Sequence, residues 1–215
     1  MLKKIILSSF VLSVSIFAST WDVNIKKDKM SGEISTYASS STVTSDEKMR
    51  FPYSNTKSWI GVGCKDGKEW AYFGFTESPN LLNTETQSGY SILYAKIKIG
   101  KTVDKIKLLQ EWGDRFLSIT NNAESFIEKL KQGKSILLEL NWHGNGKTYF
   151  TYSLQGSTKA LTKLQNECGF TKKKKKLEMI ANMSKEEKKI YESKIFCNKE
   201  YGGWKLNENG NVECK

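Results

Sequence analysis

One short segment of this 215-residue chain restricts the fold more than any other. In GYSILYAKIKIG, residues 89–100, every second residue from Leu93 to Ile99 is apolar, and the residues between them are Tyr94, Lys96 and Lys98. A period of two is typical of a strand with one face in a core and the other in solvent. The segment therefore predicts a sheet with one exposed face, and it makes Tyr94, Lys96 and Lys98 a candidate binding surface.

Two pairs of segments predict β-hairpins. SWIGVGC and EWAYFGF flank an Asp-Gly turn, and SILLELNW and TYFTYSL flank an Asn-Gly turn. Both dipeptides favour tight hairpin turns. The first hairpin is expected to contribute these residues to the core: Trp59, Val62, Cys64, Trp70, Tyr72 and Phe73.

Two short helices are predicted in the second half of the chain. Phe126, Ile127 and Leu130 share one helical face, and so do the apolar residues of TKALTKLQNEC, which follows Gly156 and Ser157. The expected fold class is mainly β, a β-rich α+β fold: an antiparallel, sandwich-like domain with two short helices at an edge or end.

The first 20 residues, MLKKIILSSFVLSVSIFAST, have the pattern of a secretory leader. A basic start precedes an apolar stretch, and Ala18 is a suitable cleavage position. The stretch is shorter than the roughly 20 apolar residues of a membrane-spanning helix. We therefore predict a Sec-type signal peptide over residues 1–18 and a periplasmic or secreted protein, with an uncleaved anchor as the alternative. The first cysteine lies far from the leader, so a lipoprotein is not expected.

Four cysteines are expected to form disulfides, because an exported chain enters an oxidising compartment. Of the three pairings, we favour Cys64 with Cys168 and Cys197 with Cys214, since a lysine run separates the cysteines into these two groups. A metal site is not expected, because the chain has no C-x-x-C and only one histidine, His143. No cofactor is expected either.

The lysine run consists of Lys172, Lys173, Lys174, Lys175 and Lys176. Residues 171–215 hold 12 basic and 7 acidic residues, so the run equals the whole net charge of the tail, +5. We predict a β-rich domain over 19–170, a lysine-rich linker over 171–176, and an appendix over 177–215.

Within the appendix, the capping-box pattern from Ser184 to Glu187 predicts a helix over 185–196. A disulfide-stapled hairpin with an Asn209-Gly210 turn is expected to follow it.

A solvated spacer, extended by self-repulsion, is the favoured role for the lysines. Contact with anionic lipid or a cell-wall polymer is the alternative. Nucleic acid is not an expected partner, since the main body is only mildly basic and phosphate binding needs basic residues across a face.

The order of several motifs resembles a known family. The motifs are Trp21-Asp22, IGVGC, YAKIKIG, WGDRFLSI, AESFIEKL, YFTYSLQGSTKAL and LQNECGF, within residues 21–170. The strongest of these motifs is YFTYSLQGSTKAL, which indicates a strand, a tight turn and a helix. Its matching residues are Tyr152, Leu154, Gly156, Ala160 and Leu161. The chain resembles the type VI secretion-associated VasI/TagO-like family, which is distantly similar to invasion-associated locus B proteins. Gly100 and Lys101 stand where that family often has an acidic residue. The resemblance implies an exported accessory protein, with a secretion apparatus as its setting.

No catalytic signature is present, whether a nucleophile elbow, a phosphate-binding loop or an H-E-x-x-H. His143 is expected to be an exposed residue of a hairpin turn, and it joins the candidate binding surface. Glu111 and Asp114 are expected to be surface acids, and Trp112 between them to pack on the core. The aromatic residues, 12% of the chain, are expected mainly in the core, with a saccharide or peptide groove as the alternative.

The sequence favours a non-enzymatic envelope accessory or binding protein with an envelope protein partner. The first alternative is an inhibitor of a secreted or cell-wall hydrolase, acting through the HGNGK tip. The second is an enzyme acting on the cell wall.

Overall fold

The computed structural model describes residues 20–208 and 211–215. The predicted signal peptide and the Asn209-Gly210 turn lie outside these residues. The strands are β1 Trp21–Lys27, β2 Ile34–Ser40, β3 Val43–Thr44, β4 Lys57–Lys65, β5 Lys68–Phe75, β6 Glu85–Gln87, β7 Tyr90–Ile99, β8 Thr102–Glu111, β9 Phe116–Ile119, β10 Ser135–Trp142, β11 Gly146–Ser153, β12 Trp204–Leu206 and β13 Val212–Cys214. The helices are α1 Ala123–Gln132, α2 Ser157–Asn182 and α3 Lys185–Tyr201.

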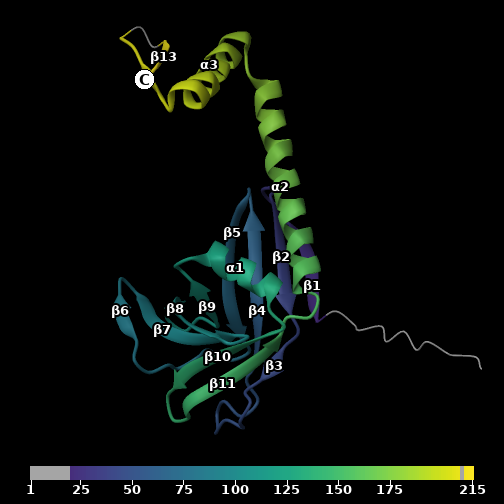
Figure 1. Ribbon diagram of the computed structural model, residues 1–215, viewed down its shortest axis with the longest axis vertical. Helices are drawn as coiled ribbons and strands as arrows, with labels where there is room; N and C mark the ends of the chain where they lie inside the picture. The colour runs from purple at the N-terminus through teal and green to yellow at the C-terminus, as the bar shows by residue number, and fades with distance from the viewer. Residues whose placement is uncertain (1–19, 209–210) are drawn as a thin grey trace, which may run out of the picture.

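One large antiparallel sheet forms the main body, in the strand order β1-β2-β4-β5-β9-β8-β7-β10-β11, with β3 on β4 and β6 on β7. Both predicted hairpins, β4–β5 and β10–β11, are confirmed. The strands β2, β4 and β5 run up the view in Figure 1, while β10 and β11 run across its lower part. The sheet is therefore bent on itself, and its two halves cross with their inner faces together. The predicted sandwich-like, mainly β architecture is confirmed.

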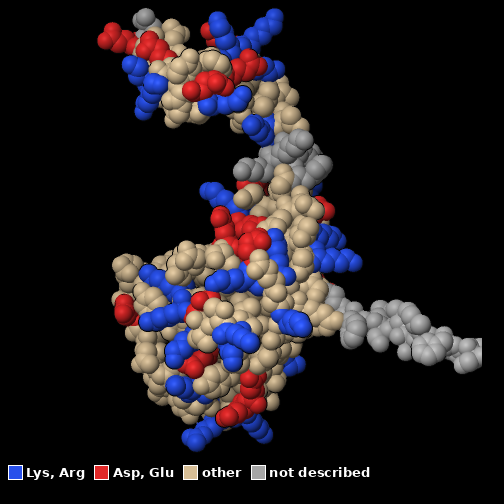
Figure 2. Space-filling view, in the orientation of Figure 1, with Lys and Arg blue, Asp and Glu red and all other residues tan. Residues whose placement is uncertain are grey.

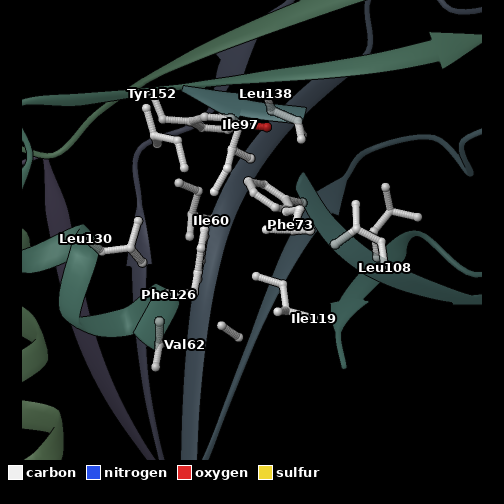
Figure 3. Close-up of a cluster of buried hydrophobic side chains, with 14 of the residues drawn as sticks. Ile60, Val62, Phe73, Ile97, Leu108, Ile119, Phe126, Leu130, Leu138 and Tyr152 are labelled. Atoms are coloured by element: carbon white, nitrogen blue, oxygen red, sulfur yellow. The ribbon is translucent and has the colours of Figure 1, made fainter. Parts of the chain in front are cut away.

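The core lies between the two halves of the sheet and α1 (Figure 3). Phe73 of β5 packs against Phe126 of α1 and Tyr152 of β11, with ring centroids 5.9 and 5.7 Å away. The Tyr152 hydroxyl lies 2.6 Å from the Ser58 hydroxyl, which donates to the Gly74 carbonyl. These buried contacts join β4 and β5 to β11, strands that are far apart in the sheet order.

The outer edge of β11 is partly covered, which restricts pairing with other chains. Asp46 donates its backbone N–H to the Tyr149 carbonyl at 2.8 Å, and its carboxylate accepts from Thr151. At the other end, the Trp21 indole donates to the Ser153 carbonyl at 3.1 Å. The beginning of β1 is thereby held against the end of β11.

The structure corrects several expectations for the first half of the chain. Val62, Cys64 and Phe73 are buried as predicted. The other three predicted core residues are only half-buried, because their side chains alternate onto the outer face of the sheet: Trp59, Trp70 and Tyr72. Trp112 does not pack on the core, since 96% of its surface is exposed in the turn after β8. β8 is a further strand that was not predicted from the sequence.

The prediction of two short helices is wrong for α2. Its first half buries Ala160, Leu161 and Leu164, as expected. The helix then continues through the lysine run to Asn182, and its second half projects away from the sheet (Figure 1). The predicted extended linker over 171–176 is therefore helical, because lysine is a good helix former and the packed first half supplies the nucleus.

The domain boundary at the lysines stays a prediction. The side chains of residues 170–175 lie outside the described part of the structure. The predicted electrostatic role of Lys172 to Lys175 therefore stays a prediction as well. Lys176, the last of the run, is exposed.

The appendix has the predicted helix and hairpin. Ser184 and Glu187 form the expected capping box at the start of α3, which runs further than predicted, to Tyr201. Both predicted disulfides are confirmed: Cys64–Cys168 ties β4 to α2, and Cys197–Cys214 ties α3 to β13.

The first prediction concerns the disulfide that joins β4 to α2. Replacing both Cys64 and Cys168 by alanine removes a link across 104 residues, so we expect the free energy of unfolding to fall by about 4–5 kcal/mol. Replacing Cys197 and Cys214, which are 17 residues apart, should lower the free energy of unfolding by about 3 kcal/mol at most. The main body should stay folded. Denaturant unfolding with peptide mapping checks both, and mapping that links Cys64 to Cys197 or Cys214 contradicts the pairing.

The second prediction concerns Tyr152, whose pKa is raised far above its ordinary range by burial, opposed by the hydrogen bond with Ser58. The folded state holds the Tyr152 proton more tightly than the unfolded state, so stability is retained below about pH 10 and falls as the pH rises above it. In Tyr152→Phe the free energy of unfolding should be lower by about 1 kcal/mol at pH 7. It should also fall less steeply above pH 10 than in the wild type. Urea unfolding at pH 7, 9 and 11 tests this, and an unchanged alkaline slope is the contradicting result.

Candidate functional site

A shallow groove crosses the outer face of β1, β2, β4, β5 and β9. It encloses about 510 Å³, and ten residues line it: Asn24, Lys26, Tyr37, Ser39, Trp59, Trp70, Tyr72, Asp114, Phe116 and Ser118. Five of the ten are aromatic, and we call this surface the aromatic groove. Because neighbouring strands lie about 4.8 Å apart, five strands make it about 19 Å long.

Three of its rings lie over glycines of the neighbouring strand. The pairs are Tyr72 over Gly61, Trp70 over Gly63, and Trp59 over Gly74. A Cβ atom at any of these glycines would overlap with the ring. Glycine therefore lets each ring rest on the backbone, so that one face of the ring contacts the sheet and the rest remains open to the groove. This explains why all three aromatic residues are half-buried.

The other two rings stand across this floor. Phe116 contacts Tyr72 at 5.2 Å with an interplanar angle of 89°, and Trp59 at 6.1 Å with an angle of 84°. Tyr37 contacts Trp70 at 5.9 Å with an angle of 81°. Edge-to-face contacts of this kind are favourable for aromatic pairs and hold the rings in place. The groove thus has a preformed floor and two aromatic walls.

Electrostatics leave the groove nearly neutral. Burial raises the pKa of Tyr72, partly opposed by a hydrogen bond from the Trp59 indole, so its hydroxyl stays protonated near neutral pH. Lys26 lies over the Tyr37 ring at 5.4 Å, a cation–π contact. The Asp114 carboxylate accepts from the backbone N–H of Arg115 at 2.6 Å. One cation and one anion therefore flank an otherwise uncharged surface.

The surface predicted from the sequence lies elsewhere on the sheet. Tyr94, Lys96 and Lys98 are exposed on β7, as their alternation predicted. Lys96 pairs with Glu139 of β10 at 3.5 Å, and Lys105 of β8 lies 4.7 Å from the centre of the Tyr94 ring. Two of its three side chains, Tyr94 and Lys96, therefore already have partners on neighbouring strands.

His143 lies in the β10–β11 turn, past the end of that strand face. Its side chain is exposed, as predicted, and its backbone N–H donates to the Asn80 carbonyl at 2.8 Å. Asn145 in the same turn accepts from the backbone of Arg50 at 2.7 Å. Two neighbouring loops therefore brace the HGNGK tip.

The predicted carboxylates do not face each other across the groove. Asp114 donates its backbone N–H to the Glu111 carbonyl in a tight turn, and Glu111 is exposed outside the groove lining. Asp114 is the sole carboxylate among the lining residues. Within the described residues, no three His, Cys, Asp or Glu side chains gather as metal ligands.

A pattern in the sequence indicates the groove, although the predicted binding surface did not include it. In IGVGC, glycines alternate with core residues, and the facing strand EWAYFGF alternates Trp70 and Tyr72 with Ala71 and Phe73. Alternating glycine in one strand opposite large aromatics in the next is the pattern of rings lying on a sheet.

Comparisons with known proteins give distant structural similarity and no similarity in sequence. No protein-family model and no curated protein matches the chain. Among solved structures, invasion associated protein B from Bartonella henselae is similar, with 13% identity, 68% of this chain and 90% of that chain covered, and a TM-score of 0.43. The resemblance to the VasI/TagO-like family stays a prediction.

Two features bear on where the protein works. Two disulfides and no free cysteine among the described residues indicate an oxidising compartment outside the cytoplasm. Among the described helices, none is long and apolar enough to cross a membrane.

The third prediction tests how the groove is built. Gly63→Ala places a Cβ inside the Trp70 ring, so we expect the ring to move off the sheet and the unfolding free energy to fall by about 1–3 kcal/mol. Tryptophan emission should shift as Trp70 becomes more hydrated. Gly169→Ala in α2 is the comparison: a Cβ there meets open space, so the emission should stay unchanged and the unfolding free energy should rise by about 0.5–1 kcal/mol. Unchanged emission and stability in Gly63→Ala would show that Trp70 does not occupy this position.

Proposed function

We propose that this protein is a non-enzymatic binding module of the cell envelope, exported to the periplasm or beyond, and that the aromatic groove is its ligand site. The observation that carries this proposal is the set of preformed rings over glycines. Exposed aromatic rings are costly to leave in water, and here three glycines make room for them. A concave surface lined by rings and a few polar groups is the usual form of a binding site.

The shortage of carboxylates in the groove supports binding without catalysis. Hydrolysis of a glycosidic bond by the common mechanism needs two carboxyl groups facing each other across the substrate. The groove lining contains one, Asp114, held in a turn by its neighbours. The protein is best described as one that captures a ligand and releases it unchanged.

The appendix supports a second, docking role. Beyond the main body, α2, α3 and the terminal hairpin expose large apolar side chains: Leu177, Met179, Ile195, Phe196, Tyr201 and Leu206. These residues lie beside basic ones, Lys176 among them. An envelope protein partner, such as a component of a secretion apparatus, would cover this apolar surface. The lysines would meet anionic lipid or cell-wall polymer.

The fourth prediction compares the two candidate surfaces directly. Tyr72→Ala removes a ring from the groove, and Tyr94→Ala removes one from the predicted β7 surface. Incubated with crude envelope extract, the Tyr72 variant should lose at least about tenfold in retention, while the Tyr94 variant should match the wild type. Circular dichroism and thermal unfolding confirm that both variants are folded. Equal retention by all three proteins would refute the groove as the ligand site.

The hydrolase-inhibitor alternative keeps a specific observation in its favour, the bracing of the HGNGK tip by Asn80 and Arg50. A rigid loop loses little entropy on docking. Cross-linking from the tip in the same extract separates the two functions. A captured hydrolase whose retention depends on His143 or Lys147, and not on Tyr72, supports inhibition.

A further inference from the structure

We infer that the ligand of the aromatic groove is a neutral oligosaccharide, an inference that rests on the proposed binding function and specifies its ligand class. Sugar rings present two kinds of surface. Their C–H groups form an apolar face, and their hydroxyl groups project around the rim. The groove offers a complement to each kind.

The floor matches the apolar faces. Trp70 and Tyr72 are two residues apart on β5, so their rings are about 7 Å apart along the strand. Each rests on a glycine and leaves the groove side open. Trp59 extends the floor from the neighbouring strand, with Phe116 standing across it. Several stacking surfaces in a row fit a chain of sugar rings better than a single small molecule.

The rim matches the hydroxyl groups. Asn24, Ser39 and Ser118 line the groove, and their side chains form no hydrogen bond with another described residue. They supply amide and hydroxyl groups that both donate and accept. Hydroxyl groups of a sugar need such groups, because each can donate one hydrogen bond and accept others.

Two other ligand classes fit less well. An extended peptide commonly binds by adding a strand to a sheet edge, where main-chain groups are unpaired. The edge strand β1 contributes only Asn24 and Lys26 to the lining, while the floor of the groove lies further inside the sheet, on β4 and β5. A peptide paired with that edge would leave the floor rings unused. Single-stranded nucleic acid also stacks on aromatic rings, but it needs a positively charged track. The groove lining contains one lysine, Lys26, and one acid, Asp114. Elsewhere on the main body, basic and acidic side chains are interspersed on the face seen in Figure 2.

The charge balance also favours neutral sugars over acidic ones. A polyanionic glycan would gain from several cations along the groove, and the lining supplies one, which already lies over the Tyr37 ring. Neutral glycans of the envelope have two sources, the glycan strands of the cell wall and neutral surface polysaccharides. The shared chemistry is a chain of uncharged sugar rings.

The experiment uses the purified protein with three probes. These are protein-free cell-wall sacculi, a soluble uncharged oligosaccharide of β-1,4-linked N-acetylhexosamine that has no stem peptides, and a soluble neutral surface polysaccharide. Sedimentation measures binding to the sacculi, and tryptophan emission measures binding of the two soluble glycans. Binding to the oligosaccharide and the sacculi, or to the neutral polysaccharide, supports the inference and identifies the source.

Variants connect the binding to the groove. Trp70→Ala and Tyr72→Ala should each weaken glycan binding on the order of tenfold or more. Trp112→Ala is the matched control, because that side chain is 96% exposed and lies outside the groove lining. Gly63→Ala should weaken binding without removing an aromatic residue, which distinguishes displacement of a ring from loss of one.

The inference and the proposed function fail in different ways. Suppose that retention of the protein by the envelope extract depends on Tyr72, while no glycan binds to it or competes. The oligosaccharide inference is then wrong, and the proposed binding function still holds. Binding to the sacculi that neither soluble glycan shares or competes with points to the stem peptides as the ligand and also overturns the inference. Glycan binding that is equal in wild type, Trp70→Ala and Tyr72→Ala overturns it as well, because the sugar would then bind outside the groove. Retention that is independent of Tyr72 refutes the proposed function itself.

Discussion

The contact between Phe73 and Tyr152 determines the organisation of the rest of the molecule. It joins the two halves of the bent sheet, with the rings 5.7 Å apart and the Tyr152 hydroxyl bonded to Ser58. Side chains alternate between the two faces along a strand. Because Phe73 points into the core, Trp70 and Tyr72 lie on the outer face of the sheet. The same alternation places Gly61 and Gly63 opposite these outward rings. The aromatic groove is thus a direct consequence of how the core closes.

Stability and binding depend on the same rings. Glycine in the interior of a strand weakens a sheet by roughly 0.5–1 kcal/mol relative to alanine, partly because it exposes backbone. In this protein Tyr72, Trp70 and Trp59 cover the three glycines concerned. Losing one ring would therefore uncover backbone as well as remove a stacking surface. Adding a methyl group below the ring, as at Gly63, displaces the ring without removing it.

The tail is organised by one helix with two different halves. The first half of α2 is anchored to the sheet by Leu161, Leu164 and the disulfide at Cys168. The second half includes the lysine run and is followed by α3 and the disulfide-linked hairpin. Like charges four residues apart oppose a helix by only about 0.2–0.5 kcal/mol per pair. The favourable propensity of lysine and the packed first half outweigh that repulsion.

The sequence by itself determined the local features. Asp-Gly and Asn-Gly specified the two hairpins, and the alternation around Tyr94 specified β7 and its exposed face. The lysine run, which separates the cysteines into two groups, indicated both disulfides. The sequence did not reveal β8, whose alternation is obscured because Gln110 is buried. The pattern also left open which face each aromatic residue takes, since EWAYFGF has rings on both faces. Only the tertiary structure decided this, because the inward face is defined by contact with Tyr152, about 80 residues away in sequence. No local pattern contains that contact, and the candidate site depends on it.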